Sequence, residues 1–122
     1  MTEGPRHTLS KTERLSGKTY ISRLVSHGRY GNESCLRFCV LKGNSLCVSR
    51  ILISVPKRNF RRAVKRNLLK RRIREAYRLR KELLGPGFDI MFIYTAREVL
   101  PSAEIAAAVE KVLLQIAAGG DE

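Results

Sequence analysis

Residues 56–81 hold almost all of the net positive charge of this chain. The segment contains 13 Lys or Arg among 26 residues and a single acidic residue, Glu75, so its net charge is +12. The whole protein has a formal net charge of +13, and its other 96 residues carry 11 bases and 10 acids. A compact cationic surface binds phosphates mainly by releasing their condensed counterions. The segment is therefore expected to bind a polyanion.

A helix over residues 62–84 would separate these cations from an apolar stripe, because each residue turns the helix by about 100°. The apolar stripe contains Leu69, Ile73, Ala76, Tyr77, Leu83 and Leu84, and the cationic face contains Asn67, Lys70, Arg71, Arg74, Arg78 and Lys81. Arginine suits this task because its planar guanidinium fits phosphate oxygens and stacks on bases. The alternative is a solvated face without a partner, although such faces usually pair acids with bases.

Residues that could support nuclease or metal chemistry within the protein itself are sparse. The two histidines, His7 and His27, lie in an expected arm and at a helix end, and Asp89 stands alone in a strand pattern. No clustered carboxylates suggest a two-metal centre. The chain has three cysteines, Cys35, Cys39 and Cys47. An odd number argues against a disulfide framework, and CxxxC spacing alone is weak evidence for zinc. We expect buried strand thiols and no metal site in the protein.

Length and composition favour one globular domain. The chain has 122 residues and 43% hydrophobic residues, enough for a single core. Residues 1–12 are expected to form a flexible arm and residues 13–118 one domain. No apolar run approaches the length of a membrane span, and the N-terminus lacks the apolar region of a signal peptide. We therefore expect a cytoplasmic protein.

Hydrophobic periodicity predicts the elements before the basic segment. A short amphipathic helix is expected over residues 16–27, with Ser16 as its N-cap. Gly31 and Asn32 predict a turn, and alternating apolar residues in segment 35–43 predict a strand with one apolar and one mixed face. Residues 46–55 are rich in β-branched side chains and predict either one long strand or two short ones.

The elements around and after the basic helix follow from turn signals. Pro56 ends the preceding strand, and residues 57–62 form a basic loop. Gly85-Pro86-Gly87 stops the long helix. A continuous apolar strand is expected over 88–95, and an amphipathic helix capped by Ser102 follows. The order αββ(β)αβα predicts one sheet with helices packed on it, and a helical crossover is right-handed by default.

Residues 63–77, AVKRNLLKRRIREAY, resemble the protein component of bacterial ribonuclease P. The family motif A-V-x-R-N-x-x-K-R-x-x-R-(E/Q) is matched in register by Ala63, Val64, Arg66, Asn67, Lys70, Arg71, Arg74 and Glu75. Other family features occur in the same order: RL followed by HG (Arg14, Leu15, His27 and Gly28), the strand ISV, and G-x-D-I-x-x-I at 87–93. The resemblance covers roughly residues 13–117.

The resemblance implies an α/β (α+β) sandwich of order αβββαβα, ribosomal protein S5 domain 2-like. It has one central mixed sheet with packed helices and a left-handed crossover, which replaces the right-handed default. It also implies the protein subunit of an endoribonuclease that removes the 5′ leader of precursor tRNA. In that ribonucleoprotein the catalytic centre lies in the RNA subunit, where Mg²⁺ activates water. The implied partners are the catalytic RNA and the leader, without a membrane or a small-molecule substrate.

The resemblance also implies two RNA-binding surfaces. The residues expected to contact the catalytic RNA are Arg66, Asn67, Lys70, Arg71 and Arg74, extended by Lys57, Arg58, Arg61 and Arg62 in the loop. A leader groove is expected between the first helix and the sheet, lined by Tyr20, Ile21, Val25, Leu36 and Phe38. Phe38 is the best candidate for base stacking. Plain core packing is the alternative for the apolar members. The loop K-R-N-F-R-R-A-V departs from the family by one extra residue and a missing glycine.

Other classes of binding protein share the charge and the size. Another RNA-binding module, such as a ribosomal protein, would lack the register of the motif. A DNA-binding helix would need a zipper or a helix-turn-helix partner. A membrane-surface helix would need the apolar face that the sheet requires.

Overall fold

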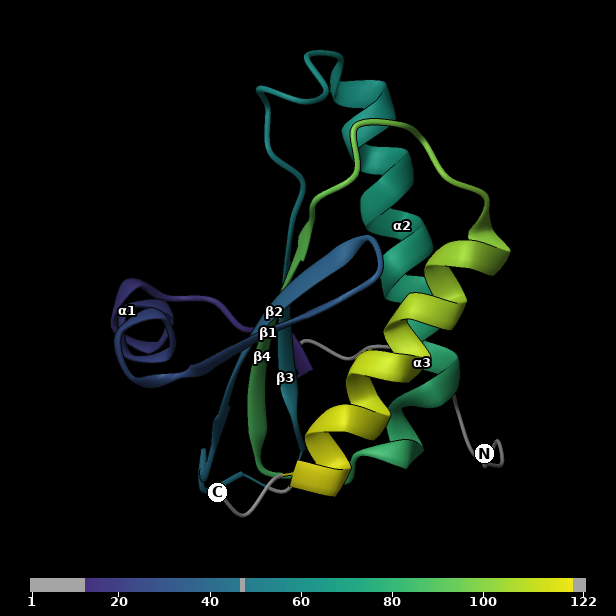
Figure 1. Cartoon of the computed structure of the whole chain (residues 1–122). Helices are drawn as coiled ribbons and strands as arrows, with labels where there is room; N and C mark the ends of the chain where they lie inside the picture. Colours follow the sequence, from purple (N-terminus) through teal and green to yellow (C-terminus); the bar gives the residue numbers. More distant parts are fainter. Residues whose placement is uncertain (1–12, 47, 120–122) are drawn as a thin grey trace, which may run out of the picture.

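The computed structural model describes residues 13–46 and 48–119. It contains one four-stranded sheet with helices on both faces (Figure 1). The elements in chain order are α1 (Lys18–His27), β1 (Arg29–Glu33), β2 (Leu36–Lys42), β3 (Arg50–Ser54), α2 (Ala63–Arg80), the 3-10 turn η2 (Lys81–Leu83), β4 (Phe88–Tyr94) and α3 (Ser102–Gly119). The arm expected over residues 1–12, and Cys47, lie outside the described residues.

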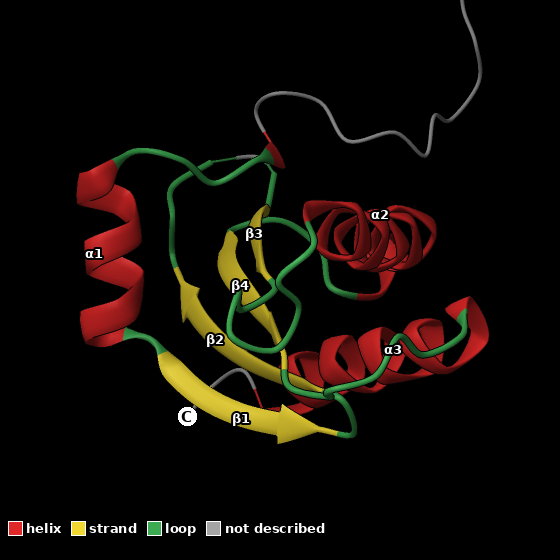
Figure 2. Cartoon of the chain, turned by 90° about the horizontal axis from the view of Figure 1, so that it is seen from above, coloured by secondary structure: helices red, strands yellow, loops and turns green. Residues whose placement is uncertain are grey.

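The sheet is mixed and has the strand order β1-β2-β4-β3. The pairs β1–β2 and β2–β4 are antiparallel, whereas β3 and β4 are parallel neighbours joined through α2. Both parallel strands run upward in Figure 1, and β4 lies to the left of β3 when the sheet is viewed from α2 (Figures 1 and 2). The crossover is therefore left-handed. The predicted order αβββαβα and the mixed sheet are confirmed.

Two hydrophobic cores of unequal size lie on the two faces of the sheet. Helices α2 and α3 cover one face, and α1 crosses the other (Figure 2). The larger core lies under α2 and α3 and includes Phe38, Phe92 and Tyr94. The buried members of the smaller core, under α1, are Leu15, Leu24 and Cys39 among the residues described. Alternation along each strand sends neighbouring side chains into different cores.

Strand β1 occupies residues that were predicted to form a turn. Gly31 pairs with Phe38 across β1 and β2. A Cβ atom at Gly31 would lie 2.5 Å from Cζ of Phe38, so the aromatic ring occupies the space of the missing side chain. The turn comes later, at Ser34, whose φ is 55°. Gly31 is therefore required by close packing within a strand rather than by a reversal of the chain.

The other boundary errors have local causes. The described residues Leu46, Val48 and Ser49 form no strand, because Asn44 accepts a hydrogen bond from Leu46 N at 2.8 Å and donates one to Val48 O at 3.1 Å. These bonds fold the segment into a turn. The predicted N-cap Ser16 is wrong as well: α1 is preceded by Gly17, with φ 97° and no side-chain cap.

Several predictions about burial are confirmed. The free thiols of Cys35 and Cys39 are buried in or against the sheet. The predicted apolar stripe is buried at Leu69, Ile73, Ala76 and Tyr77 of α2 and at Leu84. It is wrong at Leu83, which is 42% exposed because α2 ends at Arg80 and the chain continues as η2. Within the described parts of the chain, no helix is long and apolar enough to cross a membrane.

Candidate nucleic-acid interface

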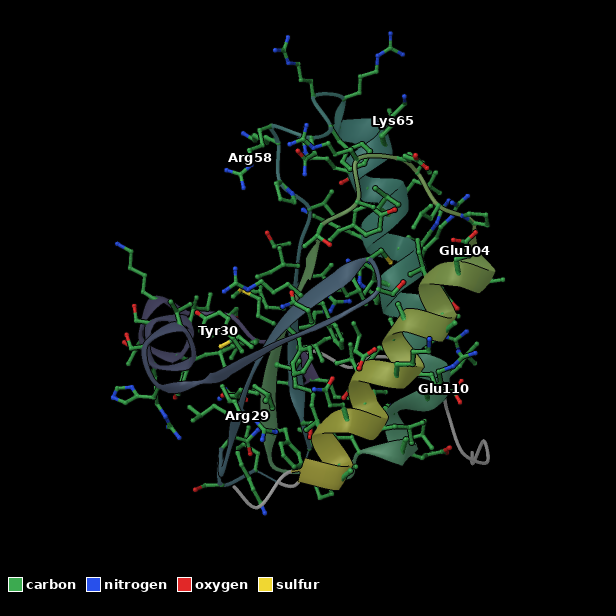
Figure 3. The ribbon with its side chains drawn as sticks, in the orientation of Figure 1. Arg29, Tyr30, Arg58, Lys65, Glu104 and Glu110 are labelled. Carbon is green, nitrogen blue, oxygen red and sulfur yellow. The ribbon has the colours of Figure 1, made fainter. Side chains whose placement is uncertain are left out.

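The basic loop and the start of α2 project past the end of the sheet and present most of the predicted cations to solvent. Figure 3 shows Arg58 and Lys65 at this end of the molecule. The exposed members are Lys57, Arg58, Arg61, Arg62, Lys65, Asn67, Arg71 and Arg74, and Lys70 is half-buried. Apart from Lys65, they lie on one loop and one helix face, so a single phosphate backbone could contact them together.

Arg66 lies among these cations but holds the loop in place. Its Nη1 donates hydrogen bonds of 2.8 Å to the carbonyl oxygens of both Phe60 and Arg61. Phe60 is buried, and its ring packs on Tyr94 with centroids 5.8 Å apart. The basic loop is therefore ordered despite its extra residue, because the buried Phe60 ring and the Arg66 guanidinium hold its backbone in place. Direct contact of Arg66 with RNA stays a prediction.

A second arginine of α2 ties down the loop after β4. Arg72 Nη1 donates to the carbonyl oxygen of Leu100 at 2.5 Å. The Tyr94 hydroxyl donates to Glu98 O at 2.6 Å and accepts from Leu100 N at 3.2 Å. Both loops beside the basic end are therefore connected to α2. The arginines of α2 therefore have two roles: some hold the neighbouring loops in place, and others supply exposed positive charge.

Lys70 and Arg74 turn toward the β3 edge of the sheet. A cavity of about 280 Å³ lies there, lined by both cations, by residues 14–16 and by residues 51–53 of β3. Leu15 N donates to Ile51 O at 2.8 Å, which brings Arg14 to the same edge. Sequence reasoning used Arg14 only as part of the family pattern. The structure adds it to the basic surface.

The predicted leader groove is wrong at Leu36 and Phe38. These side chains are 0% and 2% exposed and belong to the core under α2 and α3. Their strand alternation was read correctly, but α1 packs on the opposite face, which carries Arg37, Cys39 and Leu41. Neither residue can stack on a base without unfolding the core.

The remaining groove residues divide between two sides of α1. Tyr20 lies over Arg50, with Cζ 4.5 Å from the ring centroid, and Arg23 donates to Gly43 O at 3.3 Å. Helical spacing puts Ile21 and Val25 on the other side of α1. Tyr20 therefore does not share a groove with them.

Ile21 packs against the small core under α1 and Val25 is exposed, and strand alternation places a further row of sheet residues on the same face. Cross-strand pairing aligns Asn32, Arg37, Ile93 and Ser54 in this row. Asn32 and Arg37 are exposed, whereas Ile93 and Ser54 are half-buried. Ser54 ends β3 and leads into the basic loop, so the row lies at the basic end of the molecule.

Tyr30 is the aromatic residue of this surface, and sequence reasoning missed it. It is 41% exposed, and Arg37 Cζ lies 5.0 Å from its ring centroid. Its hydroxyl donates to Val25 O at 3.1 Å, which places it beside α1 (Figure 3). The hydrogen bond with Cys39 raises its pKa. The feature of the sequence that could have identified Tyr30 is an aromatic residue two positions after His27-Gly28.

We refer to Ile21, Val25, Tyr30, Arg37 and Ile93 as the α1 surface.

Asp89 is not an isolated carboxylate, contrary to the sequence interpretation. It accepts two hydrogen bonds from Arg50, at 2.9 and 2.8 Å, and one from Asn44 at 3.0 Å. The bond to Asp89 raises the pKa of Arg50. Both side chains are nearly buried, so the pair joins β3, β4 and the turn at Asn44 structurally.

A mixed sheet with a left-handed crossover and an arginine-rich end defines an α+β protein built to bind a phosphate backbone. The family model for ribonuclease P matches residues 9–117, and the chain belongs to this family. It is 36% identical to the ribonuclease P protein component of Porphyromonas gingivalis W83, covering 96% of this chain and 92% of that one. A relative from Borreliella afzelii is also 36% identical, over 84% of this chain and 94% of its own length.

Solved structures of the family share the fold. The ribonuclease P protein from Thermotoga maritima superimposes with a TM-score of 0.75 at 25% identity, covering 85% of this chain and 97% of that one. The protein from Staphylococcus aureus gives a TM-score of 0.75 at 24% identity, covering 88% of this chain and 96% of that one, and supports the fold alone.

Proposed function

We propose that this chain binds the catalytic RNA of ribonuclease P through its basic end and the 5′ leader of precursor tRNA through the α1 surface. The family to which it belongs acts in processing tRNA 5′ leaders as part of a ribonucleoprotein. The single observation that carries the proposal is the concentration of exposed cations on one loop and one helix face.

The contacts with the catalytic RNA are assigned to the cations that face solvent. Lys57, Arg58, Arg61, Arg62, Asn67, Arg71 and Arg74 are exposed, and Lys70 opens onto the sheet edge. Arginine and lysine neutralise phosphates, and Asn67 can hydrogen-bond a sugar or a base edge. Arg66 contributes by holding the loop, whether or not it also contacts RNA.

The leader is assigned to the α1 surface because this surface combines an exposed aromatic ring with apolar side chains and a cation. Tyr30 offers a ring face to an unpaired base, and Arg37 lies close enough to bind a neighbouring phosphate. The surface borders the basic loop, so one precursor could contact the leader site while its tRNA body lies against the catalytic RNA.

Hydrolysis is assigned to the RNA subunit and its Mg²⁺ ions. The described residues contain no group of three or more His, Cys, Asp or Glu that could hold a metal. The role left to the protein is electrostatic: cations beside the RNA lower the repulsion that opposes assembly and Mg²⁺ binding.

The test is cleavage of precursor tRNA by the cognate catalytic RNA at low, near-physiological Mg²⁺, with and without this protein. The expected result is strong activation and a 5′-phosphate on the mature tRNA. Failure of the folded protein to activate the RNA would refute the assignment.

A further inference from the structure

Tyr20 lies over a buried ion pair, on the opposite side of helix α1 from Ile21 and Val25. Its ring centroid lies 4.5 Å from Cζ of Arg50. The Arg50 and Asp89 side chains are only 12% and 3% exposed and are joined by a 2.8 Å contact. Asn44 donates a further bond of 3.0 Å to Asp89. The guanidinium is thereby fixed from below, and it fixes the plane of the ring above it.

Tyr20 is partly exposed and could bind a ligand, unlike an aromatic residue of the core. The residue is 47% exposed although one face of its ring lies on Arg50. Arg23 follows three positions later on the same side of α1 and is exposed. The carboxylate beneath the ring, Asp89, is neutralised by Arg50. The exposed part of the ring thus lies beside one exposed cation, Arg23.

We propose that Tyr20 forms a stacking site for one unpaired base of RNA, separate from the α1 surface, with Arg23 positioned to bind the adjoining phosphate. Every nucleobase has a π face, so stacking on tyrosine tolerates any sequence. A ring that is already oriented loses little conformational freedom on binding. The identity of the RNA rests on the proposed function: the base comes either from the catalytic RNA or from the precursor leader.

The two exposed tyrosines make this proposal specific. Tyr30 lies on Arg37 and Tyr20 lies on Arg50, with α1 between them. A tyrosine that served only to shield the Arg50–Asp89 pair could be replaced by any large apolar side chain. A stacking site requires a flat π surface. Tyr20→Phe and Tyr20→Leu therefore separate the two roles.

The first measurement uses tryptophan as a reporter, because the chain contains no Trp. Tyr20→Trp places the single indole at the proposed site, and Leu114→Trp on exposed α3 is the matched control. The cognate catalytic RNA is titrated first, and precursor tRNA and mature tRNA are then each added to the assembled complex. Quenching of Tyr20→Trp by the catalytic RNA, or by precursor but not mature tRNA, supports the site and identifies the source of the base. Quenching in neither titration, or equal quenching of Leu114→Trp, overturns it.

The second measurement is the dissociation constant of the RNA that quenches. Loss of one base stack is worth a factor between about five and about 140, so Tyr20→Leu should weaken binding within that range and Tyr20→Phe should not. Equal affinity of Tyr20→Leu and the wild type overturns the proposal. If Tyr20→Leu fails to fold, the fluorescence titration decides alone. Normal activation of cleavage by the wild type together with no quenching would reject this site and leave the proposed function intact.

Discussion

Arginines of helix α2 differ in what they contact: some donate hydrogen bonds to the protein backbone and others are exposed to solvent. This difference appears only when the residues are considered one by one. Arg66 and Arg72 donate to backbone carbonyl oxygens of the two loops at the basic end. Arg71 and Arg74, between or beside them in the sequence, face solvent. The motif match assigns Arg66, Arg71 and Arg74 alike to RNA, whereas Arg72 stands at one of its variable positions.

Arg66→Ala is expected to loosen the basic loop. Two charge-assisted hydrogen bonds are lost, at a cost of about 1–3 kcal/mol in local stability. Trypsin should then cleave within residues 57–62 faster than in the wild type, and binding of the catalytic RNA should weaken. Arg71→Ala is the control, for which we expect weaker RNA binding without faster cleavage. Equal proteolysis of both variants would contradict the holding role of Arg66.

Tyr30→Ala and Phe38→Ala are expected to give opposite results. Tyr30 is exposed, so its loss should reduce the preference for precursor over mature tRNA while changing urea stability little. Phe38 is buried, so its truncation should lower the free energy of unfolding by about 3–5 kcal/mol. Unchanged discrimination by the folded Tyr30→Ala variant would remove Tyr30 from the leader site.

The sequence predicted some features of these residues and not others, and the reason is physical. Alternation shows which side chains of a strand share a face, as it did for Leu36 and Phe38, but not which helix covers that face. The outcome depends on packing between elements distant in the chain. The Arg50–Asp89 pair was missed for the same reason, since its members are neighbours only through β3–β4 pairing.

At the scale of elements, Gly31 determines whether β1 can pair with β2. Gly31→Ala would place a Cβ 2.5 Å from Phe38 Cζ, and the ring is locked in the main core. We expect a loss of about 1–3 kcal/mol in unfolding free energy by overpacking. Asn32→Ala, at the adjacent exposed position, is the control and should stay within about 0.5 kcal/mol of the wild type in urea titration. Equal stability of the two variants would contradict the packing role.

The long elements could be predicted and the short ones could not. Helices α2 and α3 show strong hydrophobic periodicity, and strand β4 is a continuous apolar run. Patterns of this length identify the type of element without help from neighbouring residues. Strand β1 has only five residues, among them a glycine and an asparagine, which imitate a turn. The handedness of the β3–α2–β4 connection came from the family resemblance, because composition holds no information about it.

At the scale of the whole molecule, the charge is polarised between a basic end and a nearly neutral α3. Binding to the catalytic RNA should therefore weaken steeply with salt. Arg58→Ala should reduce the slope of log K against log salt by roughly 0.7–0.9, whereas Lys111→Ala on α3 should leave it unchanged. Filter binding at several salt concentrations measures both. Equal slopes for the two variants would contradict the assigned orientation.

Stability is expected to decline in alkali. Burial raises the pKa of the Cys35 and Cys39 thiols and of the Tyr77 hydroxyl. Above the ordinary pKa of cysteine, about 8.5, the native state retains protons that the unfolded chain releases, so the free energy of unfolding falls as pH rises. Urea titrations at pH 7.5, 9 and 10.5 should show this decline. A Cys35→Ala, Cys39→Ala double variant should decline less between pH 7.5 and 9, and a flat wild-type profile would contradict the effect.

The small core beneath α1 has a consequence for the native ensemble. Among the residues that the structure describes, this core has three buried members, with four partly buried side chains packed against it, whereas the opposite face of the sheet is covered by a far larger core. Segments with few buried apolar contacts open at a lower free energy than the whole domain. Helix α1 should therefore detach as a unit long before global unfolding, and its amides should exchange with deuterium early. Because both exposed tyrosines lie on or against this helix, an RNA held by them would also close it.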